Sequence, residues 1–220
     1  SVKELRSLGI SPDVLVCRSE QELPKDEKNK IALFCSVPAK SVISMHDVDT
    51  VYSIPILLNK QKVDDTILKK LNLKIKKPNL NDWKRVVKAK LLPEKEVNVS
   101  FVGKYTELKD SYKSINEALE HAGIQNKAKV NINFVEAEQI TSKNVRRVLK
   151  KSDAILVPGG FGERGIEGMI LACKYARENN VPYLGICLGM QIAIIEYARN
   201  VLKLKSANST EFDSSTKFPV

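Results

Sequence analysis

The chain has 220 residues, of which 43% are hydrophobic, and its formal net charge is +10 at pH 7. This length can form one large domain, or one domain with part of another. No apolar run reaches the roughly 18 residues that a membrane-spanning helix requires, and the first residues lack the apolar core and cleavage pattern of a signal peptide. We therefore expect no membrane partner.

The cysteine usage is typical of a cytoplasmic protein with reduced thiols. The four cysteines show no C-x-x-C spacing, and most lie in apolar runs, which argues against a disulfide framework or a zinc site. Only two histidines are present, so we expect no Cys/His metal cluster.

Positive charge is concentrated in residues 60–90, where eleven Lys or Arg and three Asp give a local charge of +8. Such a block can bind nucleic acid or anionic nucleotides. This one lacks interleaved aromatic residues and any nucleic-acid motif. We interpret it as a solvated, partly linker-like surface and expect no nucleic-acid partner.

Residues 1–73 alternate between strand and helix patterns. Apolar runs at 13–17 and 41–44 predict strands buried on both faces, and residues 24–35 predict a helix with Pro24 in its first turn. The other predicted elements are helices at 2–8, 51–58 and 64–71. The alternation favours a parallel sheet covered by helices. Because two strands cannot enclose a good core, we interpret this segment as the end of an α/β domain whose beginning lies outside the chain.

Residues 74–95 form the best candidate for a linker, because they are polar and basic and contain Pro78 and Pro93. Within them, residues 81–91 have the pattern of an amphipathic helix.

Residues 96–220 begin with four strand–helix repeats. The predicted strands are 97–102, 129–135, 154–157 and 182–186, and the predicted helices are 111–121, 143–150, 165–178 and 188–202. Gly123 is placed to end the first of these helices. The order predicts a doubly wound, mostly parallel α/β sheet, in which sites lie beyond the carboxyl ends of the strands.

The strand at 182–186 leads directly into Cys187, which lies between Gly185 and Gly189. This pattern is typical of a nucleophile elbow with sulfur in place of oxygen. The small residues permit a tight turn, the helix N-terminus stabilises negative charge on sulfur, and the N–H of Leu188 is placed to bind an oxyanion. The alternative is a buried structural cysteine, which the strand–turn–helix context disfavours.

A second Gly-rich segment, residues 158–165, follows the strand at 154–157. Because Pro158 opens it, we do not interpret it as a dinucleotide-binding loop. It fits the other half of an oxyanion hole, offering the N–H of Gly160 or Phe161 opposite Leu188. The alternative is a turn without a chemical role.

The residues predict a nucleophile and an oxyanion hole but no base. A cysteine nucleophile usually needs a base, and elbow enzymes supply a histidine downstream. None of the 33 residues after Cys187 is histidine. We expect His46 and His121 to be surface or packing residues, and the chain to be cut at both ends.

Residues 185–191 resemble the nucleophile motif of class I glutamine amidotransferases. Several further segments are similar to the CTP synthase family, in the right order over essentially the whole chain: 30–35, 47–49, 101–105, 157–162 and 208–212. The resemblance implies that residues 1–73 end a second α/β nucleotide-binding domain, the synthetase domain, and that residues 96–220 begin the glutamine amidotransferase domain.

The resemblance also implies an activity, that of a ligase of pyrimidine biosynthesis. Such an enzyme phosphorylates UTP with ATP and Mg²⁺, and forms CTP with ammonia that a cysteine nucleophile releases from glutamine. The implied partners are glutamine, UTP and CTP, ATP, the allosteric activator GTP, and further copies of the chain in a homotetramer.

In the second domain, the resemblance assigns the thioester-forming nucleophile to Cys187 and the recognition of the glutamine α-amino group to Glu211, where a carboxylate suits an ammonium. The other glutamine-binding positions it implies are Gly160, Leu188, Gly189, Met190 and Gln191. Phe161 and Arg164 match the neighbourhood of the GTP site.

In the first domain, the resemblance assigns pyrimidine-nucleotide binding to Lys30 and adenine contacts to His46, Asp47 and Val48, although a lysine would be expected in place of His46. The phosphate loop and Mg²⁺ carboxylates would precede Ser1. The catalytic His and Glu would follow the last residue, so we expect the fragment alone to be inactive. The alternatives are another class I amidotransferase or Cys-elbow hydrolase, or a non-catalytic self-assembly module.

Overall fold

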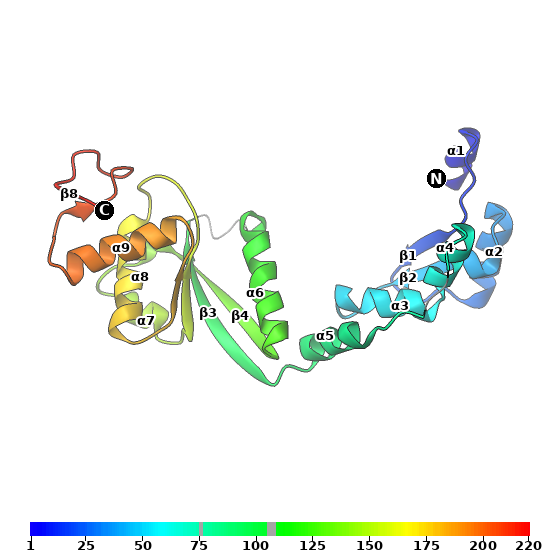
Figure 1. The fold of residues 1–220 in the computed structure, drawn as a ribbon, viewed down its shortest axis with the longest axis horizontal. Coiled ribbons are helices and arrows are strands. Elements are labelled where there is room, and N and C mark those ends of the chain that lie inside the picture. Colours follow the sequence, from blue (N-terminus) through cyan, green and yellow to red (C-terminus); the bar gives the residue numbers. More distant parts are fainter. Residues whose placement is uncertain (75–76, 105–108) are drawn as a thin grey trace. The chain divides into compact units, whose positions relative to one another are not determined.

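The computed structural model describes residues 1–74, 77–104 and 109–220 (Figure 1). The chain divides into two compact units, Ser1–Leu92 and Pro93–Val220. Their boundary falls within residues 74–95, the candidate linker. In the described part of the chain, no helix is both long enough and apolar enough to cross a membrane.

The N-terminal unit is built on two parallel strands, β1 (Leu15–Ser19) and β2 (Val42–His46), joined through α2 (Lys25–Cys35). Its small core contains the buried residues Ala32, Val37 and Val42. The remaining elements are α1 (Val2–Ser7), η1 (Ala39–Ser41), η2 (Val51–Ser53), α3 (Ile54–Lys60), α4 (Val63–Lys70) and α5 (Asn81–Leu91). The helix expected within the candidate linker is therefore present as α5, and it packs against η2 and α3 of this unit.

The C-terminal unit is a four-stranded parallel sheet in the order β4-β3-β5-β6. Its main elements are β3 (Lys95–Gly103), η3 (Lys109–Tyr112), α6 (Lys113–Gln125), β4 (Ala128–Glu136), η4 (Ala137–Gln139), α7 (Val145–Leu149), β5 (Ala154–Val157), α8 (Ile166–Glu178), β6 (Tyr183–Gly185) and α9 (Leu188–Asn200). A short parallel pair, β7 (Ala207–Asn208) and β8 (Phe218–Pro219), follows α9.

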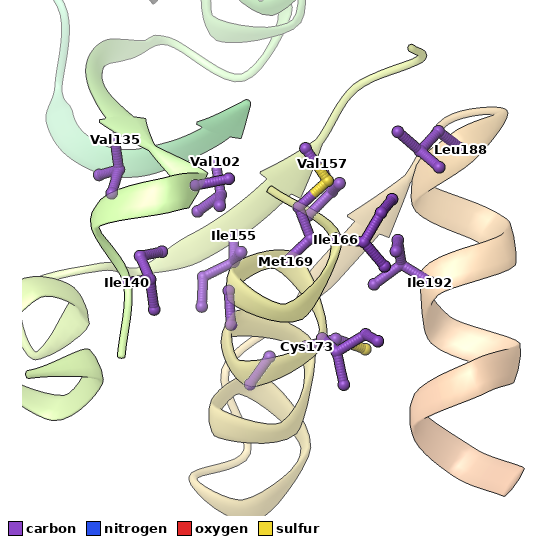
Figure 2. Close-up of a cluster of buried hydrophobic side chains, with 14 of the residues drawn as sticks. Val102, Val135, Ile140, Ile155, Val157, Ile166, Met169, Cys173, Leu188 and Ile192 are labelled. Carbon is purple, nitrogen blue, oxygen red and sulfur yellow. The ribbon is translucent and has the colours of Figure 1, made fainter. Parts of the chain in front are cut away.

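Helices cover both faces of this sheet (Figure 1). On one face, Phe101 packs with Tyr112 and Phe134 beneath α6. On the other, Val102 belongs to a larger core with residues of α7, α8 and α9. Figure 2 shows ten labelled members of this core: Val102, Val135, Ile140, Ile155, Val157, Ile166, Met169, Cys173, Leu188 and Ile192. Because neighbouring residues of a strand face opposite sides, one run of apolar residues in β3 supplies both cores.

The chain order places a topological switch point between β3 and β5. From β3 the chain adds β4 on one side, and then returns to add β5 and β6 on the other. Ligands of open α/β sheets bind beyond the carboxyl ends of the strands at such a point. The residues that follow β3 and β5 are therefore the first place to look for a site.

The expectation that Gly123 ends a helix is wrong, because α6 continues through Gly123 to Gln125. A Cβ at Gly123 would lie 2.6 Å from the carbonyl oxygen of Ala128. Glycine is required here by the close approach of α6 to the start of β4, and not by a left-handed cap.

Two isoleucines of α9 offer a matched test of the larger core. Ile192 is fully buried, whereas Ile194 is 46% exposed. We predict that Ile192→Ala lowers the free energy of unfolding of the C-terminal unit by about 2–5 kcal/mol, because it leaves a cavity. Ile194→Ala should lower it by less than about 1 kcal/mol. Urea unfolding followed by circular dichroism measures both, and equal losses would contradict this description of the core.

Candidate active site

The backbone at Cys187 has the geometry of a nucleophile elbow. Cys187 is the N-cap residue of α9, directly after β6 and Ile186, with φ 51° and ψ −103°. A non-glycine residue rarely adopts a positive φ, and such residues concentrate at functional turns. The side chain of Cys187 is exposed. The structure thus presents the sulfur to solvent from a strained turn at the start of a helix.

The two glycines beside Cys187 are required by close backbone contacts. A Cβ at Gly185 would collide with the backbone of Gly189, and a Cβ at Gly189 would collide with the carbonyl oxygen of Val157 in β5. The Tyr183 hydroxyl also donates a hydrogen bond of 2.8 Å to the Gly189 carbonyl oxygen. The first turn of α9 is therefore packed directly on β5 and β6, which fixes the position of the thiol.

The Gly-rich loop after β5 lies against this turn. A Cβ built at Gly159 would be 3.5 Å from the Cys187 Cβ, and one built at Gly160 would be 3.3 Å from Leu188 Cδ2. The N–H groups of Gly160 and Leu188 donate no hydrogen bond within the described residues. Two unused backbone donors thus come from neighbouring loops beside the thiol, an arrangement that can bind an oxyanion.

Lys104 holds the same loop from the other side. Its side chain is only 5% exposed, and its ammonium donates to the carbonyl oxygens of Phe161 at 2.9 Å and Gly162 at 2.7 Å. Burial lowers the pKa of Lys104, and Arg164 lowers it further, whereas Glu211 and Glu138 raise it. The sequence pattern did not single out Lys104, which lies in the segment 101–105 that is similar to the CTP synthase family. Its position two residues after the predicted strand 97–102 was the available signal.

Glu211 lies on a segment that is anchored to α9. Glu211 itself is exposed, and its charge influences the pKa of Lys104, which places it in the electrostatic neighbourhood of the Gly-rich loop. Arg199 donates from Nε to the carbonyl oxygen of Ala207 at 2.6 Å, and Phe212 is buried in the larger core. Sequence reasoning missed the role of Arg199, because nothing in the pattern of α9 points to it.

The other predicted glutamine-binding residues lie in the first turn of α9. Leu188 and Gly189 are buried, and Met190 is 56% exposed. The Gln191 side chain is half-buried, and its Oε1 is buried without a hydrogen-bond partner among the described residues.

The two residues predicted near a GTP site lie in the Gly-rich loop. Phe161 is 86% exposed. Arg164 forms ion pairs with Glu138 at 2.7 Å and with Glu136 at 3.7 Å. The loop also contains G-x-G-x-x-G spacing at residues 160–165, which our sequence interpretation overlooked. In the structure, Gly160 faces Leu188, Gly165 faces Ala137, and Gly162 lies in open space.

In the N-terminal unit, three of the four predicted nucleotide-binding residues line one pocket. His46, Asp47 and Val48 contribute to a cavity of about 430 Å³ whose remaining lining is Arg18, Met45, Val51 and Ile54. His46 Nδ1 is buried and has no hydrogen-bond partner in the described part of the chain. Lys30 is exposed on α2 and does not line this pocket.

Comparison with known families identifies both parts of the chain. Residues 107–216, half of the sequence, match the family model of glutamine amidotransferase class-I, and residues 1–73 match that of the CTP synthase N-terminus. The chain therefore belongs to the class I glutamine amidotransferases, and among them to the CTP synthase family. The resemblance and the α/β fold predicted from the sequence are confirmed.

Individual relatives agree with this assignment. The chain is 54% identical over all 220 residues to a CTP synthase of Caldanaerobacter subterraneus subsp. tengcongensis, and it spans 41% of that protein's length. A solved structure described as the Trypanosoma brucei CTPS glutaminase domain with bound acivicin is 41% identical, with a TM-score of 0.54. The match covers 56% of this chain and 48% of that one.

The four thiols should differ in reactivity. Burial raises the pKa of Cys173 to about 12, and burial also raises the pKa of Cys17, so both have less thiolate near neutral pH. Cys187 is exposed at the start of α9. We predict that iodoacetamide labels Cys187 at least about ten times faster than Cys173, as measured by mass spectrometry of the peptides.

The control for this prediction is the same reaction in denaturing urea, where the rates of the four cysteines should converge. Equal rates in the folded chain would argue against a preformed elbow.

Proposed function

We propose that this chain supplies the nucleophile half of the glutamine-hydrolysing site of a CTP synthase, an enzyme that aminates UTP to CTP at the expense of ATP. The observation that carries the proposal is the strained turn at Cys187, which lies against the Gly-rich loop after β5. The match of both segments to CTP synthase relatives supports it.

In the proposed reaction, the Cys187 thiolate attacks the side-chain amide carbon of glutamine. A C–S bond forms, and the amide oxygen becomes an oxyanion that accepts hydrogen bonds from the N–H groups of Leu188 and Gly160. When the tetrahedral intermediate collapses, the C–N bond breaks and the protonated nitrogen leaves as ammonia. Water then hydrolyses the thioester to glutamate. The resemblance places the histidine that carries the proton downstream of the last residue.

Recognition of glutamine is assigned to charged and polar groups around the thiol. The Glu211 carboxylate suits the α-ammonium group of the substrate. Gln191, in the first turn of α9, is assigned to glutamine binding by the family resemblance. The solved trypanosomal relative is described as a glutaminase domain with bound acivicin, which supports a ligand site in this domain.

The N-terminal unit is proposed to contribute to nucleotide binding. The pocket lined by His46, Asp47 and Val48, with a volume of about 430 Å³, has room for a purine base. Lys30 is proposed to contact UTP or CTP. No group of three or more His, Cys, Asp or Glu that could hold a metal occurs among the described residues. The family resemblance implies that Mg²⁺ acts with ATP and that its carboxylate ligands lie outside these residues.

The remaining features belong to the same proposal. The family resemblance implies that GTP binds as an activator near Phe161 and Arg164. It also implies that the protein assembles into a homotetramer and is located in the cytoplasm. The exposed ring of Phe161 supports the first of these, because it is available to stack on a base.

The test replaces Cys187 with serine in the full-length protein that contains this chain. Glutamine-dependent CTP formation should fall by at least about 1,000-fold, because the nucleophile is lost. CTP formation from added ammonia should stay within about twofold, because ammonia bypasses glutamine hydrolysis. The matched control is Cys35→Ser, a half-buried cysteine of the other unit.

Two results would contradict the proposal. Retention of glutamine-dependent activity in Cys187→Ser would exclude this thiol as the nucleophile. A wild-type protein that hydrolyses glutamine but forms no CTP from UTP, ATP and ammonia would instead be another class I amidotransferase.

A further inference from the structure

Lys104 occupies the switch point of the sheet. It directly follows β3, and β3 pairs with β5, whose carboxyl end continues into the Gly-rich loop. Its side chain is among the few buried charged groups of the described chain. A lysine is rarely buried unless its ammonium is paired. We therefore expect the buried ammonium of Lys104 to have a specific function.

Among the described residues, the ammonium of Lys104 is bonded to the loop and not to a carboxylate. It donates to the carbonyl oxygens of Phe161 and Gly162, while the Lys104 carbonyl accepts from the Tyr112 hydroxyl at 2.5 Å. Tyr112 in turn packs its ring on Phe101 of β3. The lysine is therefore fixed at its backbone by the sheet's core, and it fixes the loop with its side chain.

The part of the Gly-rich loop that Lys104 binds is adjacent to the part that lies beside the Cys187 thiol. Gly159 faces Cys187 and Gly160 faces Leu188, whereas the next two residues carry the carbonyl groups that Lys104 binds. Gly162 has φ +74° with open space around it, so few packing contacts hold this part of the loop. Without the ammonium, the direction of the Gly160 N–H group would depend mainly on its contact with Leu188.

The charged residues around Lys104 are compatible with a lysine that holds the Gly-rich loop. Arg164 is the nearby cation that lowers its pKa, but Arg164 is itself paired with Glu138 and Glu136. The negative charge of Glu211 instead raises the pKa of Lys104. The lysine is thus linked electrostatically to the segment assigned to the substrate's ammonium group as well as to the loop assigned to the oxyanion.

We propose that Lys104 is a positioning residue for glutamine hydrolysis, whose ammonium holds the 158–162 loop so that the Gly160 N–H group points to the oxyanion formed at Cys187. This inference rests on the proposed function. Lys104 acts through the loop and touches no reacting atom. Its removal should therefore raise the barrier of the chemical step more than it weakens the binding of glutamine.

The test measures glutamate release from glutamine and ammonia-dependent CTP formation in the full-length protein. Lys104→Met removes the ammonium and keeps much of the side-chain volume. We expect kcat for glutamate release to fall by about 10–100-fold and KM for glutamine to change by less than about threefold. Lys104→Arg, which restores charged donors, should recover part of kcat. The control is Lys143→Met, an exposed lysine of the same unit, which should change neither parameter.

The outcomes separate the inference from the function on which it rests. Unchanged kcat in Lys104→Met would overturn the inference, as would an equal loss of the glutamine-dependent and ammonia-dependent rates, which would show a general structural role. If the wild type hydrolyses glutamine without forming CTP, the proposed function fails, whereas the effect of Lys104 on kcat for glutamate release still decides the inference.

Discussion

The contact on which the site depends is between the first turn of α9 and the end of β5. Gly189 lies directly on the Val157 carbonyl group, which leaves Cys187 in a backbone conformation that costs about 1–3 kcal/mol for a residue with a side chain. Burial of one face of α9 in the larger core and the ion pair of Arg177 with the buried Glu196 offset this strain. The thiol is held in place because the helix behind it cannot move away from the sheet.

Around this rigid turn, the polar parts of the site lie on loops that single side chains anchor. Lys104 bonds the loop that carries Gly160, and Arg199 bonds the segment that leads to Glu211. Both anchors donate to backbone carbonyl groups, so they constrain the course of the chain and not only a side chain. Sheet and helix thus fix the Cys187 thiol, while two buried or half-buried cations fix the groups proposed to bind the oxyanion and the substrate.

Sequence patterns predicted the elements that depend on local periodicity. The order of strands and helices in both units and the tight turn at Cys187 follow from apolar runs and from two glycines. The sequence pattern did not predict the role of a residue where that role depends on contacts with residues distant in the sequence. Gly123 was assigned to a helix end, although its role is to let α6 approach Ala128. The position of Lys104 after a predicted strand did not reveal that its ammonium bonds a loop almost sixty residues away. The roles of the individual site residues stay predictions, because they depend on bound substrates.

We propose that Cys187, Leu188 and Gly160 form one preorganised site for a nucleophile and its oxyanion. The most direct measurement is a crystal structure of the full-length protein after reaction with acivicin, the compound bound in the trypanosomal relative. We expect a covalent bond from acivicin to Cys187 Sγ, with the nearest polar atom of acivicin within about 3 Å of the Leu188 and Gly160 amide nitrogens. An adduct on another cysteine, or a Gly-rich loop turned away from Cys187 in the adduct, would contradict it.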